Sequence, residues 1–163
     1  MDVIEAIRTK RAIREFTDQP LSDEDIRTIL NAGRRAQSSK NTQPWTFVAI
    51  RDRETLRRLS ECGTYAGHLA GAALGVALVS SVEDNFDIGQ AAACMQLAAW
   101  DLGIGSCIAS MWEPERAKEI IGVPIDLHFH TAISFGYPKG QARPGGVQGG
   151  RKPFEEAVRW DHF

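Results

Sequence analysis

The hydrophobic residues of this sequence recur at helical spacing in some stretches and at strand spacing in others. A short first helix is predicted after Asp2, where Glu5 completes a capping box. A second helix is predicted after Ser22, with Asp25 in the same capping role. Each predicted helix has one apolar face. The residues of these faces are Val3, Ile4 and Ile7 in the first helix and Ile26, Ile29, Leu30 and Gly33 in the second.

The middle and the end of the chain continue this alternation. Residues 45–50 have strand character, and the continuous apolar run at 76–79 is typical of a buried central strand. Residues 53–60 are predicted to form an amphipathic helix with Leu56 and Leu59 inside. A glycine turn that runs into a strand at 103–110, a short helix at 113–121 and a strand at 128–135 complete the pattern.

The longest apolar segment is a predicted helix at residues 87–102, which only Gly89, Gln90, Gln96 and Asp101 interrupt. A helix that is apolar on every side must be buried on every side. Its length of roughly 24 Å is difficult to cover within so small a domain. We therefore expect a second subunit to supply part of the covering in a symmetric dimer. Burial entirely within one chain is the alternative.

Composition narrows the class of protein. The chain has 163 residues, of which 43% are hydrophobic, enough for one ordinary core and a single domain over residues 1–163. A net charge of -2 and a pI near 6.1 provide no basic surface for nucleic acid and no cationic face for a membrane. The sequence predicts neither a signal peptide nor a membrane span. The spacings of Cys62, Cys94 and Cys107 match no zinc or redox pair, so we expect reduced thiols in a cytoplasm.

Several familiar site types are not supported. His128 and His130 share one face of a predicted strand, but no third ligand is evident, so no metal site is predicted. The turn that begins at Gly103 is not a dinucleotide fingerprint, because the third glycine would fall at Ile108. Residues 140–150 hold five glycines and are expected to form a flexible loop, after which Phe154, Trp160 and Phe163 give the tail apolar groups with which to dock.

Two polar clusters are candidates for ligand binding. Before the strand at 45–50, Ser38, Ser39, Asn41 and Gln43 place hydroxyls and carboxamides close together. Such groups both donate and accept hydrogen bonds, which suits the polar edge of a planar heterocycle. The alternative is a polar turn with local side-chain hydrogen bonds, and composition alone favours that alternative.

The second cluster consists of Lys10, Arg11 and Arg14 at the end of the first predicted helix. Cations at that position offset the helix dipole. The same side chains suit a phosphate dianion, because the arginine fork and the lysine charge both neutralise it. The residues alone leave both interpretations open.

Taken in order, four segments resemble the FMN-dependent nitroreductase family nearly from end to end. Residues 10–14 resemble its basic Arg-Arg-Ser-Ile-Arg motif, and residues 38–45 resemble its Pro-Ser-Ser-x-Asn-x-Gln-Pro-Trp loop. Residues 102–107 resemble its Leu-Gly-Leu-Gly-Ser-Cys turn. Residues 136–138 and 151–153 together resemble its C-terminal pair of motifs. Each motif is weak alone, but the ordered set is fairly specific.

The resemblance implies an α+β fold, a three-layer α/β/α sandwich around a mixed, mainly antiparallel sheet. It also implies an intertwined homodimer with FMN at the subunit interface. NADH or NADPH would reduce the flavin, and a small electron-poor acceptor, such as a nitroaromatic or a quinone, would then take the hydride in a ping-pong cycle. No catalytic side chain or metal is needed, because the flavin carries the chemistry. The alternatives are a flavin storage or sensing protein without turnover and a family branch with a specialised substrate.

The same resemblance implies a contact set for FMN. The phosphate would be surrounded by Lys10, Arg11, Arg14 and Arg151, with Ala12 at the position of the motif's serine. The ring edge or the ribityl chain would be met by Ser38, Ser39, Asn41 and Gln43, from the partner subunit. Backbone groups near Ala109 and Ser110 would bind the hydride-accepting ring nitrogen, and His68 would lie beside the cofactor. For His68, a solvated helix histidine is the alternative.

The sequence also departs from the family pattern. Lys10 replaces an arginine, Ala12 replaces a serine and Gln37 replaces a proline, so weaker flavin binding is expected. Ser110 and Met111 stand where glycine is frequent, which would alter the approach to the flavin face. The chain also lacks the helices that cover the flavin in longer members. We therefore expect either more open substrate access or covering by a tail residue such as Trp160.

Overall fold

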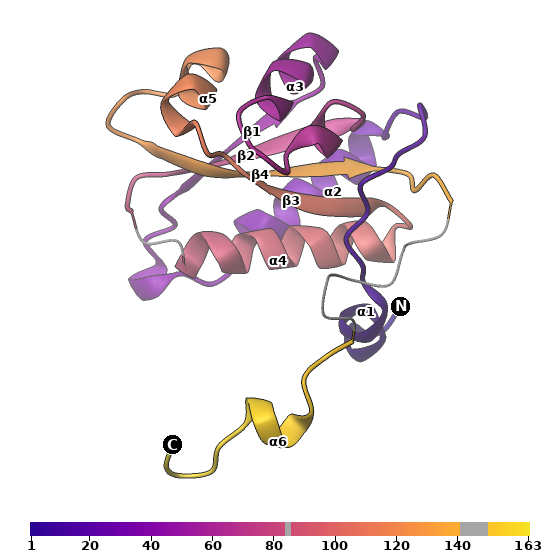
Figure 1. Cartoon of the computed structure of the whole chain (residues 1–163), viewed down its shortest axis with the longest axis vertical. Helices are drawn as coiled ribbons and strands as arrows, with labels where there is room; N and C mark the ends of the chain where they lie inside the picture. The colour runs from indigo at the N-terminus through magenta and orange to yellow at the C-terminus, as the bar shows by residue number, and fades with distance from the viewer. Residues whose placement is uncertain (84–85, 141–149) are drawn as a thin grey trace.

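The protein is described by a computed structural model that covers residues 1–83, 86–140 and 150–163 (Figure 1). Its sheet consists of β1 Trp45–Ile50, β2 Leu74–Ser80, β3 Gly105–Ser110 and β4 His128–Gly136. The helices are α1 Val3–Thr9, α2 Asp23–Arg34, α3 Arg53–Ser60, α4 Phe86–Asp101, α5 Pro114–Ile121 and α6 Phe154–Ala157. Two 3-10 turns lie at η1 Ser39–Asn41 and η2 Gly67–Leu69.

The described residues form three layers, as Figure 1 shows. The strands are antiparallel neighbours in the order β1-β2-β4-β3. Helices α2 and α4 cover one face of the sheet, and α3, η2 and α5 cover the other. A parallel bridge between Ala12 and Ser106 adds a short contact at the β3 edge. The predicted α+β sandwich is therefore confirmed, with a sheet whose described strands are all antiparallel.

Strand β2 is buried along its whole length because both faces of the sheet are covered. Successive side chains of a strand point to opposite faces. Leu74, Val76 and Leu78 therefore pack toward α2 and α4, whereas Ala77 and Val79 pack toward α3 and α5. This two-sided burial explains why the sequence shows a continuous apolar run there rather than an alternating one.

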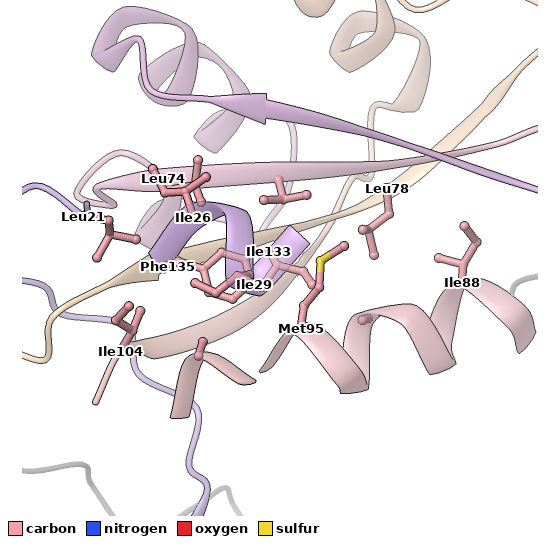
Figure 2. Packing of buried hydrophobic residues seen from close by; sticks show 13 residues of the cluster. Leu21, Ile26, Ile29, Leu74, Leu78, Ile88, Met95, Ile104, Ile133 and Phe135 are labelled. Atoms are coloured by element: carbon pink, nitrogen blue, oxygen red, sulfur yellow. The ribbon is translucent and has the colours of Figure 1, made fainter. Parts of the chain in front are cut away.

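The core beneath the sheet is closely packed. Figure 2 shows Ile29 of α2, Phe135 of β4 and Met95 of α4 gathered between the helices and the strands, and all three side chains are fully buried. Gly33 of α2 faces the same methionine, and a Cβ at this glycine would lie 2.2 Å from Met95 Cε. The absence of a side chain at Gly33 lets α2 and α4 approach each other.

Most predicted elements are confirmed close to their predicted bounds. Strand β1 and helix α3 span the predicted residues, and the central strand extends to Leu74–Ser80. Both capping boxes form at the backbone level: the Glu5 N–H donates to Asp2 Oδ1 at 2.8 Å, and the Asp25 N–H donates to Ser22 Oγ at 3.0 Å.

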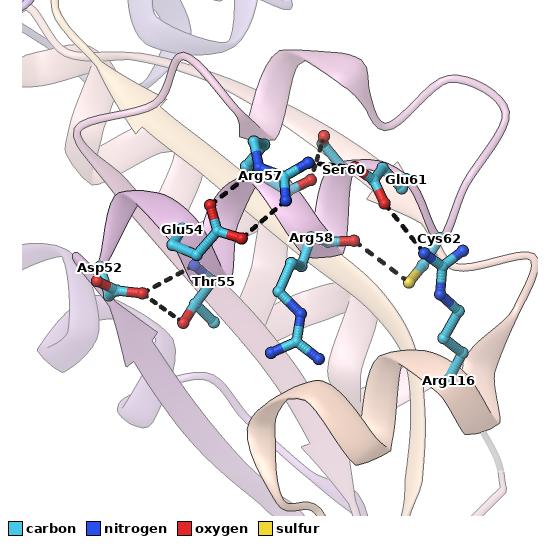
Figure 3. A network of polar contacts seen from close by, with 9 residues as sticks. All are labelled: Asp52, Glu54, Thr55, Arg57, Arg58, Ser60, Glu61, Cys62 and Arg116. Carbon is cyan, nitrogen blue, oxygen red and sulfur yellow. Dashed lines mark hydrogen bonds and ion pairs between the residues drawn. The ribbon is translucent and has the colours of Figure 1, made fainter.

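Surface ion pairs join α3 to α5 on the outer layer (Figure 3). Arg57 lies between two carboxylates of its own helix region, 2.7 Å from Glu54 and 2.5 Å from Glu61. Arg116 of α5 reaches the same Glu61 at 3.0 Å. All these side chains are largely exposed, so solvent screens the network and each pair contributes little to stability.

Two apolar surfaces remain uncovered in one chain. On α1, only Ala6 is buried, whereas Val3, Ile4 and Ile7 are 59–73% exposed. On α4, Ile88 and Met95 lie on the buried side, but Phe86 is 71% exposed. One chain therefore does not bury α4 on every side. The predicted second subunit stays a prediction.

The C-terminal tail leaves the body of the molecule, and α6 lies apart from the three layers in Figure 1. The rings of Phe154 and Trp160 lie 6.5 Å apart, yet both side chains are more than 60% exposed. The predicted flexible loop at 140–150 falls largely on residues 141–149, which lie outside the described residues. Among the described helices, none is long and apolar enough to cross a membrane.

Candidate functional site

The outer edge of β3 exposes backbone hydrogen-bonding groups. Strand β3 is at one end of the sheet and pairs only with β4. Its register continues past the strand, where the Met111 N–H donates to the His130 carbonyl at 2.9 Å. Odd-numbered residues of β3 therefore bond to β4, and the N–H and C=O groups of the even-numbered residues point away from the sheet. Ile108 and Ser110 are two of these residues.

Both ends of this edge are occupied by other segments. At one end, the Ile13 N–H donates to the Ser106 carbonyl at 2.9 Å. At the other end, the Cys62 carbonyl accepts the Trp112 N–H at 2.8 Å and the Glu113 N–H at 3.0 Å. The N–H groups of Ile108 and Ser110 lie between these contacts, whereas the Ile108 carbonyl accepts a contact from Cys107 Sγ at 3.6 Å. We call this open stretch, formed by the backbone edge of residues 108–110, the β3 notch.

Three cations, Lys10, Arg14 and Arg151, lie near one another at the start of β3. Burial lowers the pKa of Lys10, and the nearby Arg151 lowers it further. Burial raises the pKa of the Cys107 thiol, whereas Arg14 and Lys10 both act to lower it. Within residues 1–83, 86–140 and 150–163, none of these three cations forms a salt bridge. Grouped cations without counter-charges favour the binding of an anion.

The structure separates Arg11 from this group. Its Nη1 donates to the carbonyl oxygens of Arg8 and Lys10, both at 2.9 Å, so it binds the C-terminal end of α1. This is the helix-end interpretation that the sequence left open. Ala12 is exposed and joins Ser106 through its backbone alone. The phosphate roles of Arg11 and Ala12 stay predictions.

His68 is buried in η2, with 9% of its surface exposed, so the solvated-histidine alternative is wrong. Its Nδ1 lies 2.7 Å from Ser134 Oγ, which in turn lies 3.3 Å from the Cys107 carbonyl oxygen. Burial is the main cause that lowers the pKa of His68, and Arg14 also lowers it, while a contact with the Ile108 backbone opposes both. The imidazole is therefore neutral at pH 7, next to the β3 notch.

The polar loop before β1 is held by its own hydrogen bonds. Ser38 Oγ accepts the Gln43 N–H at 2.9 Å, and Gln43 Nε2 donates to the Asn41 carbonyl at 3.4 Å. The local turn that the sequence offered as an alternative is therefore present. Lys40, Asn41 and Gln43 nevertheless have φ values of 51°, 55° and 48°. Non-glycine residues in this region cost about 1–3 kcal/mol each, and such strain concentrates at functional sites.

One chain does not bring this loop to the β3 notch. The Ser39 N–H donates to Asp87 Oδ2 at 3.0 Å, at the start of α4. Nine residues further along α4, Gln96 Nε2 donates to Ser106 Oγ at 3.2 Å, near the start of β3. Nine residues of α-helix rise by about 14 Å, which is the separation of these two contacts along α4. The predicted contact set thus divides into two halves that lie beside different turns of one helix.

Other surface features near the two halves were not anticipated from the sequence. A groove of about 570 Å³ borders the loop, with Gln43 at one end and the stacked rings of Trp45 and Phe47 along its wall, 6.1 Å apart. Beside the notch, Trp112 is 70% exposed and Tyr65 is 82% exposed. These features depend on how separate elements pack, which hydrophobic spacing does not reveal.

No metal site accompanies these groups in the described part of the chain. The rings of His128 and His130 stack 6.4 Å apart. Residues 1–83, 86–140 and 150–163 contain no cluster of three or more metal-binding side chains.

The β3 notch and its cations fit FMN. A phosphate matches Lys10, Arg14 and Arg151, which have no salt-bridge partner in the described residues. The polar edge of the isoalloxazine ring matches outward backbone N–H groups. His68 adds a buried nitrogen, Nε2, that has no hydrogen-bond partner within the described residues.

Comparisons with known proteins agree with this geometry. The model of the Nitroreductase family matches residues 7–62 and 68–137. The chain is 34% identical over 150 residues to a putative NADH dehydrogenase/NAD(P)H nitroreductase of Archaeoglobus fulgidus, covering 85% of this chain and 86% of the relative. It is 27% identical over 201 residues to an NADH dehydrogenase of Thermus thermophilus, covering 98% of this chain and 96% of that relative. An FMN-dependent nitroreductase structure from Clostridium difficile superposes with a TM-score of 0.87 at 26% identity, covering 99% of this chain and 100% of that one.

Proposed function

Because the chain belongs to the nitroreductase family, we propose that it reduces small electron-poor acceptors, such as nitroaromatics or quinones, with hydride from NADH or NADPH. Flavin-dependent oxidoreductase activity with FMN follows from the family and from its relatives. The acceptor class and the ping-pong order are the proposed part. When bound, FMN supplies the chemistry by accepting a hydride and passing it on.

The observation that carries the proposal is the β3 notch beside three cations that form no salt bridge within the described residues. Lys10, Arg14 and Arg151 bind the phosphate in this proposal, and their charges offset its two negative charges. The outward N–H groups of Ile108 and Ser110 donate to the polar ring edge. The chain thus binds and orients the cofactor mainly through charge and backbone geometry.

The complete site in this proposal lies between two copies of the chain. The loop at residues 38–43 and the β3 notch lie beside different turns of α4, so a second copy related by a two-fold axis can supply the missing half. The exposed apolar faces of α1 and α4 and the detached tail support the same homodimer. A closed dimer would bury surfaces that one chain leaves open.

The test is an anaerobic absorbance experiment on the FMN-reconstituted protein. NADPH and then NADH are added, followed by a nitroaromatic or a quinone. We expect rapid bleaching of the bound flavin by at least one nicotinamide and recovery of its absorbance when the acceptor is added. Bound flavin that stays oxidised with both donors would refute the proposal and support the storage or sensing alternative. Failure to bind FMN would refute the site assignment itself.

A further inference from the structure

One buried nitrogen of His68 has no partner that the described chain supplies. Nδ1 contacts Ser134 Oγ at 2.7 Å, but Nε2 is buried without a hydrogen bond. A buried polar atom without a partner is costly, and in a native fold it needs an explanation such as a missing ligand. His68 also contacts the backbone of Ile108, so the imidazole ring lies beside the β3 notch.

The hydrogen bonds of Ser134 favour one tautomer of the neutral imidazole. A serine hydroxyl has one proton to donate. The Cys107 carbonyl can only accept, so the 3.3 Å contact requires Ser134 Oγ to donate to it. Ser134 Oγ must then accept the proton of His68 Nδ1–H. In the tautomer that satisfies both contacts, Nε2 carries a lone pair and is free to take a proton.

The positive charge near His68 disfavours protonation of Nε2 as long as no anion is bound nearby. Arg14 of the N-terminal segment lowers the pKa of His68, whereas the backbone of Ile108 in β3 raises it. The neighbour from β4 is Ser134, which is neutral. Among the described residues, no carboxylate acts on the imidazole. The protein therefore supplies no negative charge of its own to hold a proton on Nε2.

We propose that His68 is the redox-linked proton acceptor of this site, with Nε2 unprotonated beside oxidised flavin and protonated beside reduced flavin. The inference rests on the proposed function. Transfer of a hydride from the nicotinamide gives the flavin two electrons and one proton and leaves it with one negative charge. One proton from water then binds His68 Nε2 and balances that charge. The proton leaves again when the hydride passes to the acceptor.

Two physical effects favour this assignment. An opposite charge within about 4–6 Å favours the protonated imidazole. The backbone of Ile108 also favours the protonated imidazole, because it raises the pKa of His68. His68 is a proton-binding group in this proposal and makes no covalent bond to the substrate.

The decisive measurement is the NMR signal of the histidine ring carbons in FMN-loaded protein labelled at histidine, at pH 7, before and after anaerobic reduction. His68→Gln assigns the signal of His68. We expect this signal to change from neutral imidazole to imidazolium on reduction, while those of His128, His130 and His162 stay in place. The wild-type spectra, recorded over a pH series, decide the question even if the variant does not fold.

A second readout counts the protons taken up for each flavin that is reduced, with a pH indicator in weakly buffered solution. His68→Gln should take up one proton fewer than the wild type, and the matched control His130→Gln should equal the wild type. Flavin that is bound and reduced while the His68 signal does not move would overturn this inference and leave the proposed function standing. Flavin that does not bind, or is not reduced by either nicotinamide, would overturn the proposed function and this inference with it.

Discussion

Gly63 controls the shape of the β3 notch because it packs directly on the backbone of Ser110. A Cβ at this glycine would lie 2.2 Å from the Ser110 carbonyl oxygen and 3.0 Å from Ala66 Cβ. Neither atom is the flexible end of a side chain. Gly63→Ala therefore forces the turn at residues 62–66 and the end of β3 apart by about 1 Å, to reach ordinary contact distance.

Two consequences follow from that displacement. Overpacking of this kind costs about 1–3 kcal/mol of stability. The shift also moves the Ser110 N–H away from the ring edge that it is proposed to bind. Loss of one such hydrogen bond costs about 0.5–1.5 kcal/mol, which weakens FMN binding by about 2- to 13-fold.

The matched control is Gly67→Ala, four residues later. A Cβ at Gly67 meets nothing within 4 Å, so this variant should bind FMN like the wild type and unfold at the same or a slightly higher urea concentration. FMN affinity is measured by fluorescence quenching, and stability by urea unfolding of the apoprotein. Equal FMN affinity in the Gly63 and Gly67 variants would refute the reasoning.

Three further predictions concern charge and packing. Arg14→Ala should weaken FMN binding by about tenfold or more. Arg11→Ala should change FMN binding little, because Arg11 binds the end of α1. A fluorescence titration in which Arg11→Ala weakens binding more than Arg14→Ala would contradict the assignment. Met95→Ala should cost about 2–5 kcal/mol in urea unfolding, because the fully buried side chain leaves a cavity. Arg57→Ala should lower the melting temperature only slightly, and 1 M NaCl should remove the difference from the wild type, because salt screens exposed ion pairs.

The elements that the sequence predicted well are those whose apolar positions are buried by the same chain. Leu56 and Leu59 are fully buried between α3 and the sheet, so their spacing correctly predicted the inner face of α3. The exposed face of α1 shows the limit of this reasoning. Val3 and Ile4 have helical spacing, but spacing does not reveal which surface covers them.

The candidate site was predictable only in part. The cations near β3 were recognisable as a cluster in the sequence. The sequence does not show that Arg11 binds carbonyl oxygens at the end of α1 while Arg14 lies near Cys107, because this difference depends on the path of the folded backbone. The β3 notch depends on strand register, which decides whether the N–H of Ser110 points inward or outward. The burial of His68 depends on Ser134, 66 residues away in the sequence.

The two halves of the contact set also explain why α4 is apolar on every side. The helix separates the contact that holds the loop at residues 38–43 from the contact near the start of β3 by about 14 Å. A symmetric partner that supplies the missing half must pack along that helix, so the outer side of α4 has to be apolar as well. In the proposed dimer, the surface that joins the subunits and the surface that completes the flavin site are therefore parts of one continuous interface. A substitution on the outer side of α4 would then affect cofactor binding without contacting the cofactor.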